Sequence, residues 1–322
     1  MLERPSRRGF IGRGAAALAF APWAAKAQSS GALSADQAAD DAEKIAAAND
    51  AARHLTIAAT INGRGPVRFV VDTGADRTVI ADDVAAAFGL AEGSQVMVEG
   101  VVRTVPAHTT HIGNLSFGPV TRNNLVVPVL PRATLNADGY LGLDAIDGYR
   151  VTLDFKNHAL MVGAPARPHI FDWLAPTEAR VKVDGPYGHL RALNCRIDGV
   201  HATAFIDTGA EVSIGNAKLF EALAATSPSY VKQDTVLLTG VTGGIIEGRT
   251  TTVEGIHIGS VELDGCTIAI ANLQIFGIWG LADQPALLVG MNFLRSFAQV
   301  SVDYGRKEIS FEMASLVVAA RS

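Results

Sequence analysis

Few of the sequence features that mark other enzyme classes occur in this chain. It has only two cysteines among 322 residues, and it contains no CxxC, HExxH, GxSxG or phosphate-loop motif. Their absence argues against thiol-redox, zinc-peptidase, serine-hydrolase and nucleotide-phosphate chemistry. The net charge is −5 with no visible basic patch, which argues against a nucleic-acid partner. No apolar run reaches the length of a membrane-spanning helix.

A metal centre is not predicted either. His108 and His111 stand three residues apart on a predicted strand, so their side chains would point to opposite faces. We therefore expect neither a metal nor another cofactor. The two cysteines, Cys195 and Cys266, would be paired in an oxidising compartment or would be two buried thiols, and the sequence leaves both alternatives open.

The first 27 residues have the pattern of an export signal. Arginines near the start are followed by a short, mildly apolar run and then by Ala25-Lys26-Ala27, an A-x-A cleavage signal. The string Ser6-Arg7-Arg8-Gly9-Phe10-Ile11 is similar to the twin-arginine signal of bacteria. We expect residues 1–27 to be removed and the mature protein to be periplasmic or extracellular. The alternative is an arginine-bearing tail without that role.

The segment 28–52 is rich in alanine, and Ser34 and Gln37 have the spacing of a capping box. It is either a short helix or a removable pro-segment, and the sequence does not decide between them.

The chain contains an internal sequence repeat. The run "VRFVVDTGA" ends at Ala75 and the run "ATAFIDTGA" ends at Ala210, and a histidine (His54, His189) stands 18 positions before each aspartate. Alternating apolar residues rich in Val, Ile and Thr, with Gly or Asn at the turns, predict a β-rich structure. The repeat places one lobe at 53–162 and a second at 180–313, with a proline-containing linker at 163–179 and a tail at 314–322.

Later parts of the repeat also correspond. The run "THIGNLSFG" is matched with "IHIGSVELDG", which aligns Ile112-Gly113 with Ile258-Gly259, and "YLGLDAI" is matched with "LVGMNFL". The offset between the lobes then grows from 135 at Asp72 and Asp207 to 146 at Ile112 and Ile258. This predicts an insertion in the second lobe within residues 224–247.

Two lobes that each present Asp-Thr-Gly at a strand end resemble the aspartic peptidases, and most closely their retropepsin-like branch. Asp72-Thr73-Gly74-Ala75-Asp76 is similar to the retroviral protease signature, and Asp207-Thr208-Gly209-Ala210 repeats its first half. The short lobes look like those of exported bacterial retropepsin relatives. The resemblance implies an all-β fold with two homologous β-barrel lobes in one chain. It also implies an active site at the lobe interface, a peptide or protein substrate, and activity as a monomer.

The chemistry of such a site explains why two aspartates are needed. Peptide hydrolysis without a metal requires a base to activate water and an acid for the carbonyl oxygen and the leaving amine. Two carboxyls about 3 Å apart cannot both ionise, so they share one proton, as they do in the aspartic proteases. Gly74 and Gly209 would let the backbone bring N–H groups close to the carboxylates. By resemblance, Thr73 and Thr208 would hydrogen-bond across the lobe interface.

The side of the site that faces substrate is predicted less fully. By resemblance, Asp76 and Glu211 would contact the substrate backbone, but the arginine that braces this acid in retroviral enzymes is missing, since Leu143 and Met291 follow the glycines. Two hairpins would form a lid, one with Gly100 near its tip and the other with Gly243 and Gly244; the alternative is two ordinary surface hairpins. The alternative functions are a catalytically silent peptide-binding or regulatory relative and a β-barrel ligand binder.

Overall fold

The computed structural model describes residues 43–46, 48–49, 55–166, 178–183, 191–231 and 234–313, all within the compact unit Gln37–Ser322. The predicted export signal, the tail 314–322, and His54 and His189 lie outside the described residues. Strands dominate the described chain, so the predicted all-β fold is confirmed. Its longest helix has 10 residues, and none of the helices in the described part is long and apolar enough to cross a membrane.

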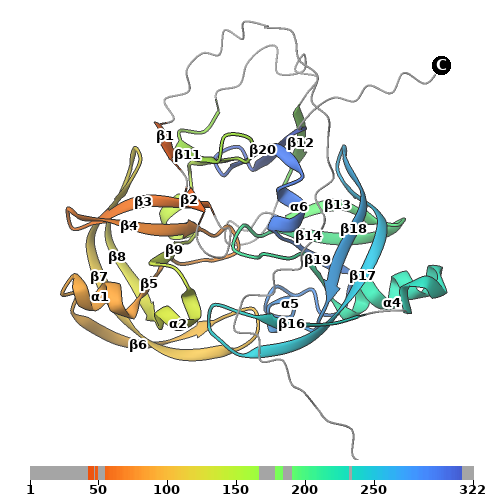
Figure 1. The fold of residues 1–322 in the computed structure, drawn as a ribbon, viewed down its shortest axis with the longest axis horizontal. Helices are drawn as coiled ribbons and strands as arrows, with labels where there is room; N and C mark the ends of the chain where they lie inside the picture. Colours follow the sequence, from red (N-terminus) through yellow and green to blue (C-terminus); the bar gives the residue numbers. More distant parts are fainter. Residues whose placement is uncertain are drawn as a thin grey trace, which may run out of the picture. The chain divides into compact units, whose positions relative to one another are not determined.

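The first lobe is built on one eight-stranded sheet (Figure 1). Its strands are β2 (Ala48–Asn49), β3 (Leu55–Ile61), β4 (Arg64–Val71), β5 (Val79–Ala81), β6 (Glu92–Glu99), β7 (Thr104–Phe117), β8 (Val120–Leu130) and β9 (Gly139–Leu141). They lie in the order β2-β3-β4-β9-β5-β8-β7-β6, and β3 also pairs with β7, which closes the strands from β3 to β7 into a circuit. Its short helices are α1 (Asp82–Ala87), α2 (Arg132–Leu135) and α3 (Leu143–Ile146).

The second lobe repeats this topology with seven strands. They are β13 (Arg191–Ile197), β14 (Val200–Ile206), β15 (Ile214–Gly215), β16 (Asp234–Thr239), β17 (Ile245–Ile258), β18 (Val261–Ile270) and β19 (Ala286–Val289). Their order is β13-β14-β19-β15-β18-β17-β16, and β13 closes the circuit by pairing with β17. The helices are α4 (Ala217–Thr226), the 3₁₀ helix η3 (Pro228–Val231), α5 (Gln274–Ile278) and α6 (Met291–Leu294).

The first hairpin of each lobe forms where the sequence predicts it. Asn62 and Gly63 have φ of 51° and 74°, and Asp198 and Gly199 have φ of 47° and 82°. Two consecutive residues with positive φ match the twist of the flanking strands, and Asn, Asp and Gly tolerate that conformation best.

The predicted alignment of the later strands is wrong by five residues. Phe117 and Val120 flank the β7–β8 turn, and Ile258 and Val261 flank the β17–β18 turn. Phe117-Gly118 is therefore the counterpart of Ile258-Gly259, because each glycine takes the positive φ of its turn, 52° and 61°. Ile112 instead lies in the middle of β7, opposite Leu125. The isoleucine–glycine pairs look alike in sequence but occupy different positions in the sheet.

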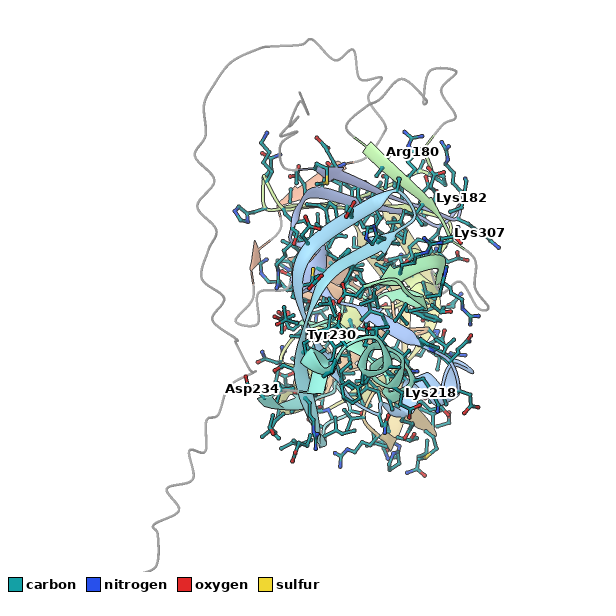
Figure 2. The ribbon with its side chains drawn as sticks, turned by 90° about the vertical axis from the view of Figure 1, so that its right-hand side faces the viewer. Arg180, Lys182, Lys218, Tyr230, Asp234 and Lys307 are labelled. Atoms are coloured by element: carbon teal, nitrogen blue, oxygen red, sulfur yellow. The ribbon has the colours of Figure 1, made fainter. Side chains whose placement is uncertain are left out.

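The extra residues of the second lobe consequently fall in two places. The first is the predicted region, where α4 has 10 residues against 6 in α1 and is followed by η3. The Tyr230 hydroxyl of η3 donates to the Asp198 carboxylate in the β13–β14 turn, which fixes this insertion to the lobe; Figure 2 labels Tyr230 beside α4. The second place lies between β18 and β19, where α5 stands in a longer connection than the one that holds α2.

A third sheet joins the two lobes. Its strands are β1 (Glu43–Ala46), β10 (Arg150–Asp154), β11 (Ala159–Gly163), β12 (Glu178–Lys182), β20 (Phe297–Asp303) and β21 (Glu308–Met313). The order is β1-β11-β10-β20-β21-β12, so the closing strand pair of one lobe pairs directly with that of the other, as Leu153 does with Val300. Buried residues of both lobes and of this sheet form one hydrophobic cluster, and a second, smaller cluster that includes Phe205 and Phe276 lies within lobe two.

The predicted boundaries of the linker and of the alanine-rich segment differ from the structure, because both segments contribute strands to the sheets. β12, which carries Arg180 and Lys182 (Figure 2), begins at Glu178, inside the predicted linker. Glu308 of β21 lies 2.8 Å from Lys182 and 3.9 Å from Arg180. The described part of the alanine-rich segment forms two short strands, β1 at the other edge of this sheet and β2 at the edge of the first lobe's sheet, so this part is not helical.

The two cysteines are both free thiols. Cys195 is buried, and burial raises the pKa of its thiol to about 12. Cys266 is partly buried, and burial raises the pKa of its thiol as well. Of the two alternatives that the sequence left open, the disulfide is therefore not formed.

Candidate active site

The two aspartates stand at equivalent strand ends. Asp72 follows β4 and its N–H donates to Leu141 O of β9 at 3.0 Å, while Asp207 follows β14 and its N–H donates to Val289 O of β19 at 2.9 Å. β4 and β9 run parallel, as do β14 and β19. Each aspartate is therefore held by a central strand of its own lobe, on a rigid part of the sheet.

The carboxyl groups of Asp72 and Asp207 meet across the lobe interface and are hydrogen-bonded to each other. The N–H of Gly74 donates to Asp72 Oδ1 at 2.9 Å, and the N–H of Gly209 donates to Asp207 Oδ1 at 2.9 Å. Each glycine also lies against the carboxyl of the opposite lobe. A Cβ on Gly74 would stand 2.7 Å from Asp207 Cγ, and one on Gly209 would stand 2.6 Å from Asp72 Cγ.

The surroundings of Asp72 favour its protonated form. Burial raises the pKa of this carboxyl well above its usual range, and the nearby charge of Asp207 raises it further. The N–H groups of Gly74 and Ala75 hydrogen-bond to Asp72 and lower its pKa, but they do not offset the two larger effects. The pair can therefore hold a proton in conditions where an isolated, exposed aspartate would have lost it.

Two threonines join the aspartate loops. Thr73 Oγ1 donates to Ile206 O at 2.8 Å, and Thr208 Oγ1 donates to Val71 O at 2.6 Å. Each Oγ1 also accepts the N–H of the other threonine, at 3.1 Å and 3.2 Å. Both side chains are buried, so these bonds are shielded from water. The cross-lobe hydrogen bonds predicted for Thr73 and Thr208 are thus present.

A second set of supports was not predicted from the sequence. In lobe one, Asp144 Oδ1 accepts both the N–H and the hydroxyl of Thr78, each at 2.7 Å. In lobe two, Asn292 Oδ1 accepts both the N–H and the hydroxyl of Ser213, each at 2.8 Å. The signal is in the repeat, since Thr78 and Ser213 stand six residues after their aspartates, and Asp144 and Asn292 stand two residues after the paired glycines.

The acidic residues after the aspartate motifs have different surroundings. The expectation that Glu211 has no bracing arginine is wrong, because Arg295 at the end of α6 reaches it with two nitrogens. Arg295 Nη1 lies 3.1 Å from Glu211 Oε2, and Nη2 lies 3.3 Å from Oε1. Arg295 stands four residues after Met291, which occupies the position of the arginine in retroviral enzymes. Lobe one has Asp147 at the equivalent position and cannot form this pair, and Asp76 is exposed beside the cleft.

The two predicted lid hairpins, β6–β7 and β16–β17, are present and their tips touch (Figure 1). Arg103 Nε donates to Thr242 O at 3.0 Å, and Thr242 Oγ1 donates to Arg103 O at 2.8 Å. Gly100 packs against Thr242, and Gly243, with φ of 74°, packs against Arg103. The predicted tip glycines therefore contact the opposite hairpin, and the hairpins together cover the space above Asp72.

Beneath the hairpins is a cavity of about 580 Å³ that opens on Asp72. Both lobes contribute to its walls, which are mostly apolar. Asp76, Glu99 and Arg77 line it on the side of lobe one, and Arg191 lines it on the side of lobe two. Its apolar residues include Val96, Met97, Val98, Val126, Pro128, Phe205, Ile275, Ile278 and Trp279. An extended chain with apolar side chains would fit such a space.

Within the described ranges no group of three or more His, Cys, Asp or Glu side chains is placed to hold a metal ion. His108 instead pairs with Glu92, with 3.0 Å between Nδ1 and Oε1, on the exposed face of the β6–β7 hairpin.

Comparison with known families agrees with the site. Residues 57–145 match the aspartyl protease family, and residues 193–296 match the gag-polyprotein aspartyl protease family. The first match contains Asp72 and the second contains Asp207. No curated protein matches the chain. The chain therefore belongs to the retropepsin-like aspartyl proteases and carries two such domains in tandem.

Proposed function

We propose that the protein is an aspartic endopeptidase in which Asp72 and Asp207 share one proton and activate a water molecule. The observation that carries the proposal is the hydrogen bond between the two carboxyls, which meet at the interface of the lobes under a pair of hairpins. Because one chain supplies both aspartates, a monomer is sufficient for activity. The substrate is a peptide or a protein segment bound in the cavity beside Asp72.

The reaction follows from the shared proton. The ionised carboxylate takes a proton from water while the water oxygen bonds to the peptide carbonyl carbon, and the protonated carboxyl gives its proton to the carbonyl oxygen. The proton taken from water then passes to the peptide nitrogen as the C–N bond breaks. When the C–N bond breaks, the diol formed by addition of water becomes the new carboxyl group and gives one proton back to the pair. The two aspartates then share one proton again. Because burial and the nearby charge of Asp207 raise the pKa of Asp72, the pair keeps one shared proton in the resting state.

The experiment that tests the function is digestion of casein and of a peptide library by the mature protein. New peptide termini should appear with the wild type and not with Asp72→Asn. If both proteins leave every substrate intact over a range of acidic pH, the proposed peptidase function is rejected.

Activity is predicted to depend on pH through the surroundings of the dyad. Ala75 and Ala210 provide no hydroxyl to the carboxylates, while burial raises the pKa of Asp72, so activity should peak in mildly acidic solution, at roughly pH 4 to 6. A serine hydroxyl at both positions would donate to the charged form and lower the pKa of the pair. The double variant Ala75→Ser, Ala210→Ser should move the acid limb of kcat/KM to lower pH. A limb that does not move in a folded variant would contradict this assignment.

We also propose that the protein is exported through the twin-arginine route, on the basis of the string around Arg7 and Arg8 and of Ala25-Lys26-Ala27. Changing both arginines to lysine should leave the full-length precursor in the cytoplasm, whereas the wild type should be found outside it and begin at Gln28. Cell fractionation with N-terminal sequencing measures both. Normal processing of the double variant would point to the general secretory route.

A further inference from the structure

Three arginines of the described chain lie with the guanidinium over an aromatic ring. The pairs, with the distance from Cζ to the ring centre, are Arg64 and Phe88 (4.8 Å), Arg122 and Tyr149 (5.0 Å), and Arg191 and Phe205 (5.2 Å). Such stacking leaves the edge of the guanidinium, with its five N–H donors, available for hydrogen bonds in the plane of the group.

The first two arginines use those donors within the protein. Arg64 donates to the carbonyl oxygens of Ala87 and Phe88 at 3.2 Å and 3.1 Å. Arg122 donates to the carbonyl oxygens of Ala145 and Asp147 at 2.8 Å and 2.6 Å.

Arg191 differs from both. Its Nε is buried and has no acceptor among the residues that the structure describes. A buried N–H without an acceptor is unfavourable, and such atoms are few in native proteins.

Arg191 is also the one of the three that lines the cavity beside Asp72. The position of Arg191 in the cavity is fixed by Phe205, the ring that its guanidinium covers. Phe205 in turn stacks on Trp279, with 4.3 Å between ring centres and 8° between planes. Arg191 lies directly opposite Phe205 in the β13–β14 pair. The equivalent pair in lobe one is Thr56 and Val70, so only lobe two places a cation in the cleft in this way.

We propose that Arg191 selects peptides that carry an acidic side chain, Glu or Asp, near the bond to be cleaved; this rests on the proposed peptidase function. The guanidinium edge matches the two oxygens of a carboxylate, and the bound side chain supplies the acceptor that Nε lacks. The dyad, Asp76 and Glu99 place negative charge beside the cavity and would repel an acidic substrate, and Arg191, together with Arg77, offsets that repulsion. The apolar residues that line much of the cavity lower the local dielectric, which strengthens the pair.

The test uses the mature protein and pairs of peptides that differ only by Glu or Gln, with the substitution moved through each position around the cleaved bond. At one position kcat/KM should be about ten-fold higher for Glu than for Gln, the size expected for a charge-assisted hydrogen bond. The ratio should fall toward one in Arg191→Met and be partly kept in Arg191→Lys. It should be unchanged in Arg64→Met, which removes a matched arginine–phenyl stack outside the cleft.

A second measurement follows from the ionisation of the substrate. The ratio of Glu to Gln turnover should decline as the pH falls below about 4, because the glutamate of the peptide becomes neutral there. Equal turnover of Glu and Gln peptides by the wild type at every position would overturn the inference and leave the peptidase function standing. Cleavage of no peptide at all would instead reject the proposed function. The ratio of Glu to Gln turnover by the wild type tests the inference even if the Arg191→Met variant does not fold.

Discussion

Replacing either aspartate of the dyad by asparagine is expected to reduce kcat/KM by about 10³-fold or more. Asparagine has nearly the same shape as aspartate but cannot take a proton from water or give one to the carbonyl oxygen. Because Asp72 and Asp207 share one proton, they act as a unit, and the double variant should be no worse than either single variant. Initial rates on a peptide identified in the casein or library digest provide the measurement.

The structure offers a matched control for this substitution. Asp144 is another largely buried acid of lobe one, and burial raises the pKa of its carboxyl. Its counterpart in lobe two is Asn292, which accepts the same two hydrogen bonds through Oδ1. Asp144→Asn should therefore fold and keep most of the activity. Substantial turnover by Asp72→Asn, or equal losses in Asp72→Asn and Asp144→Asn, would contradict the assignment of the dyad.

The second large effect is expected at Gly209. An alanine Cβ there would stand 2.6 Å from Asp72 Cγ and Oδ2, closer than real Cβ atoms come to any neighbour. The Asp72 carboxyl is short and is held by the N–H groups of Gly74 and Ala75, so it cannot swing aside without losing its position. Gly209→Ala should reduce kcat/KM by about 100-fold, the cost of moving a catalytic group by about 1 Å. It should also lower the free energy of unfolding by about 1–3 kcal/mol through overpacking.

Gly277 in α5 is the control for this effect. A Cβ at Gly277 meets no atom within 4 Å, and the residue lies inside a helix, where alanine is favoured over glycine by about 0.5–1 kcal/mol. Gly277→Ala should leave activity unchanged and should not lower the melting temperature. If Gly209→Ala behaves in the same way, the close approach of the two lobes at the dyad does not limit catalysis.

Much of the site could be predicted from the sequence because it is encoded locally and twice. Each Asp-Thr-Gly string follows an apolar strand, and a strand end followed by glycine positions a carboxylate with backbone donors near it. The hairpin turns at Asn62-Gly63 and Asp198-Gly199 follow from residues that accept positive φ. The predicted lid hairpins carry the same kind of signal, since glycines interrupt apolar alternating runs.

The register of the later strands and the pairing of strands far apart in the chain were decided only by the tertiary structure. The Ile-Gly pairs of the two lobes look equivalent in sequence, yet the register of β7 and β17 aligns Phe117 with Ile258, because turn geometry and pairing with the first strand set the register. The third sheet depends on pairing between strands about 150 residues apart, such as Thr152 with Ser301, and no local pattern specifies such a partner.

The same holds for single side chains in the cleft. Arg295 reaches Glu211 from a helix that the sequence separates from it by 84 residues, and Arg191 enters the cavity only because β13 pairs with β14 and Phe205 stacks on Trp279. Local sequence thus determined where the two carboxylates stand on their strands, since strand ends and turns form from neighbouring residues. Long-range packing determined which charged groups surround them, since those contacts exist only once both lobes have folded together.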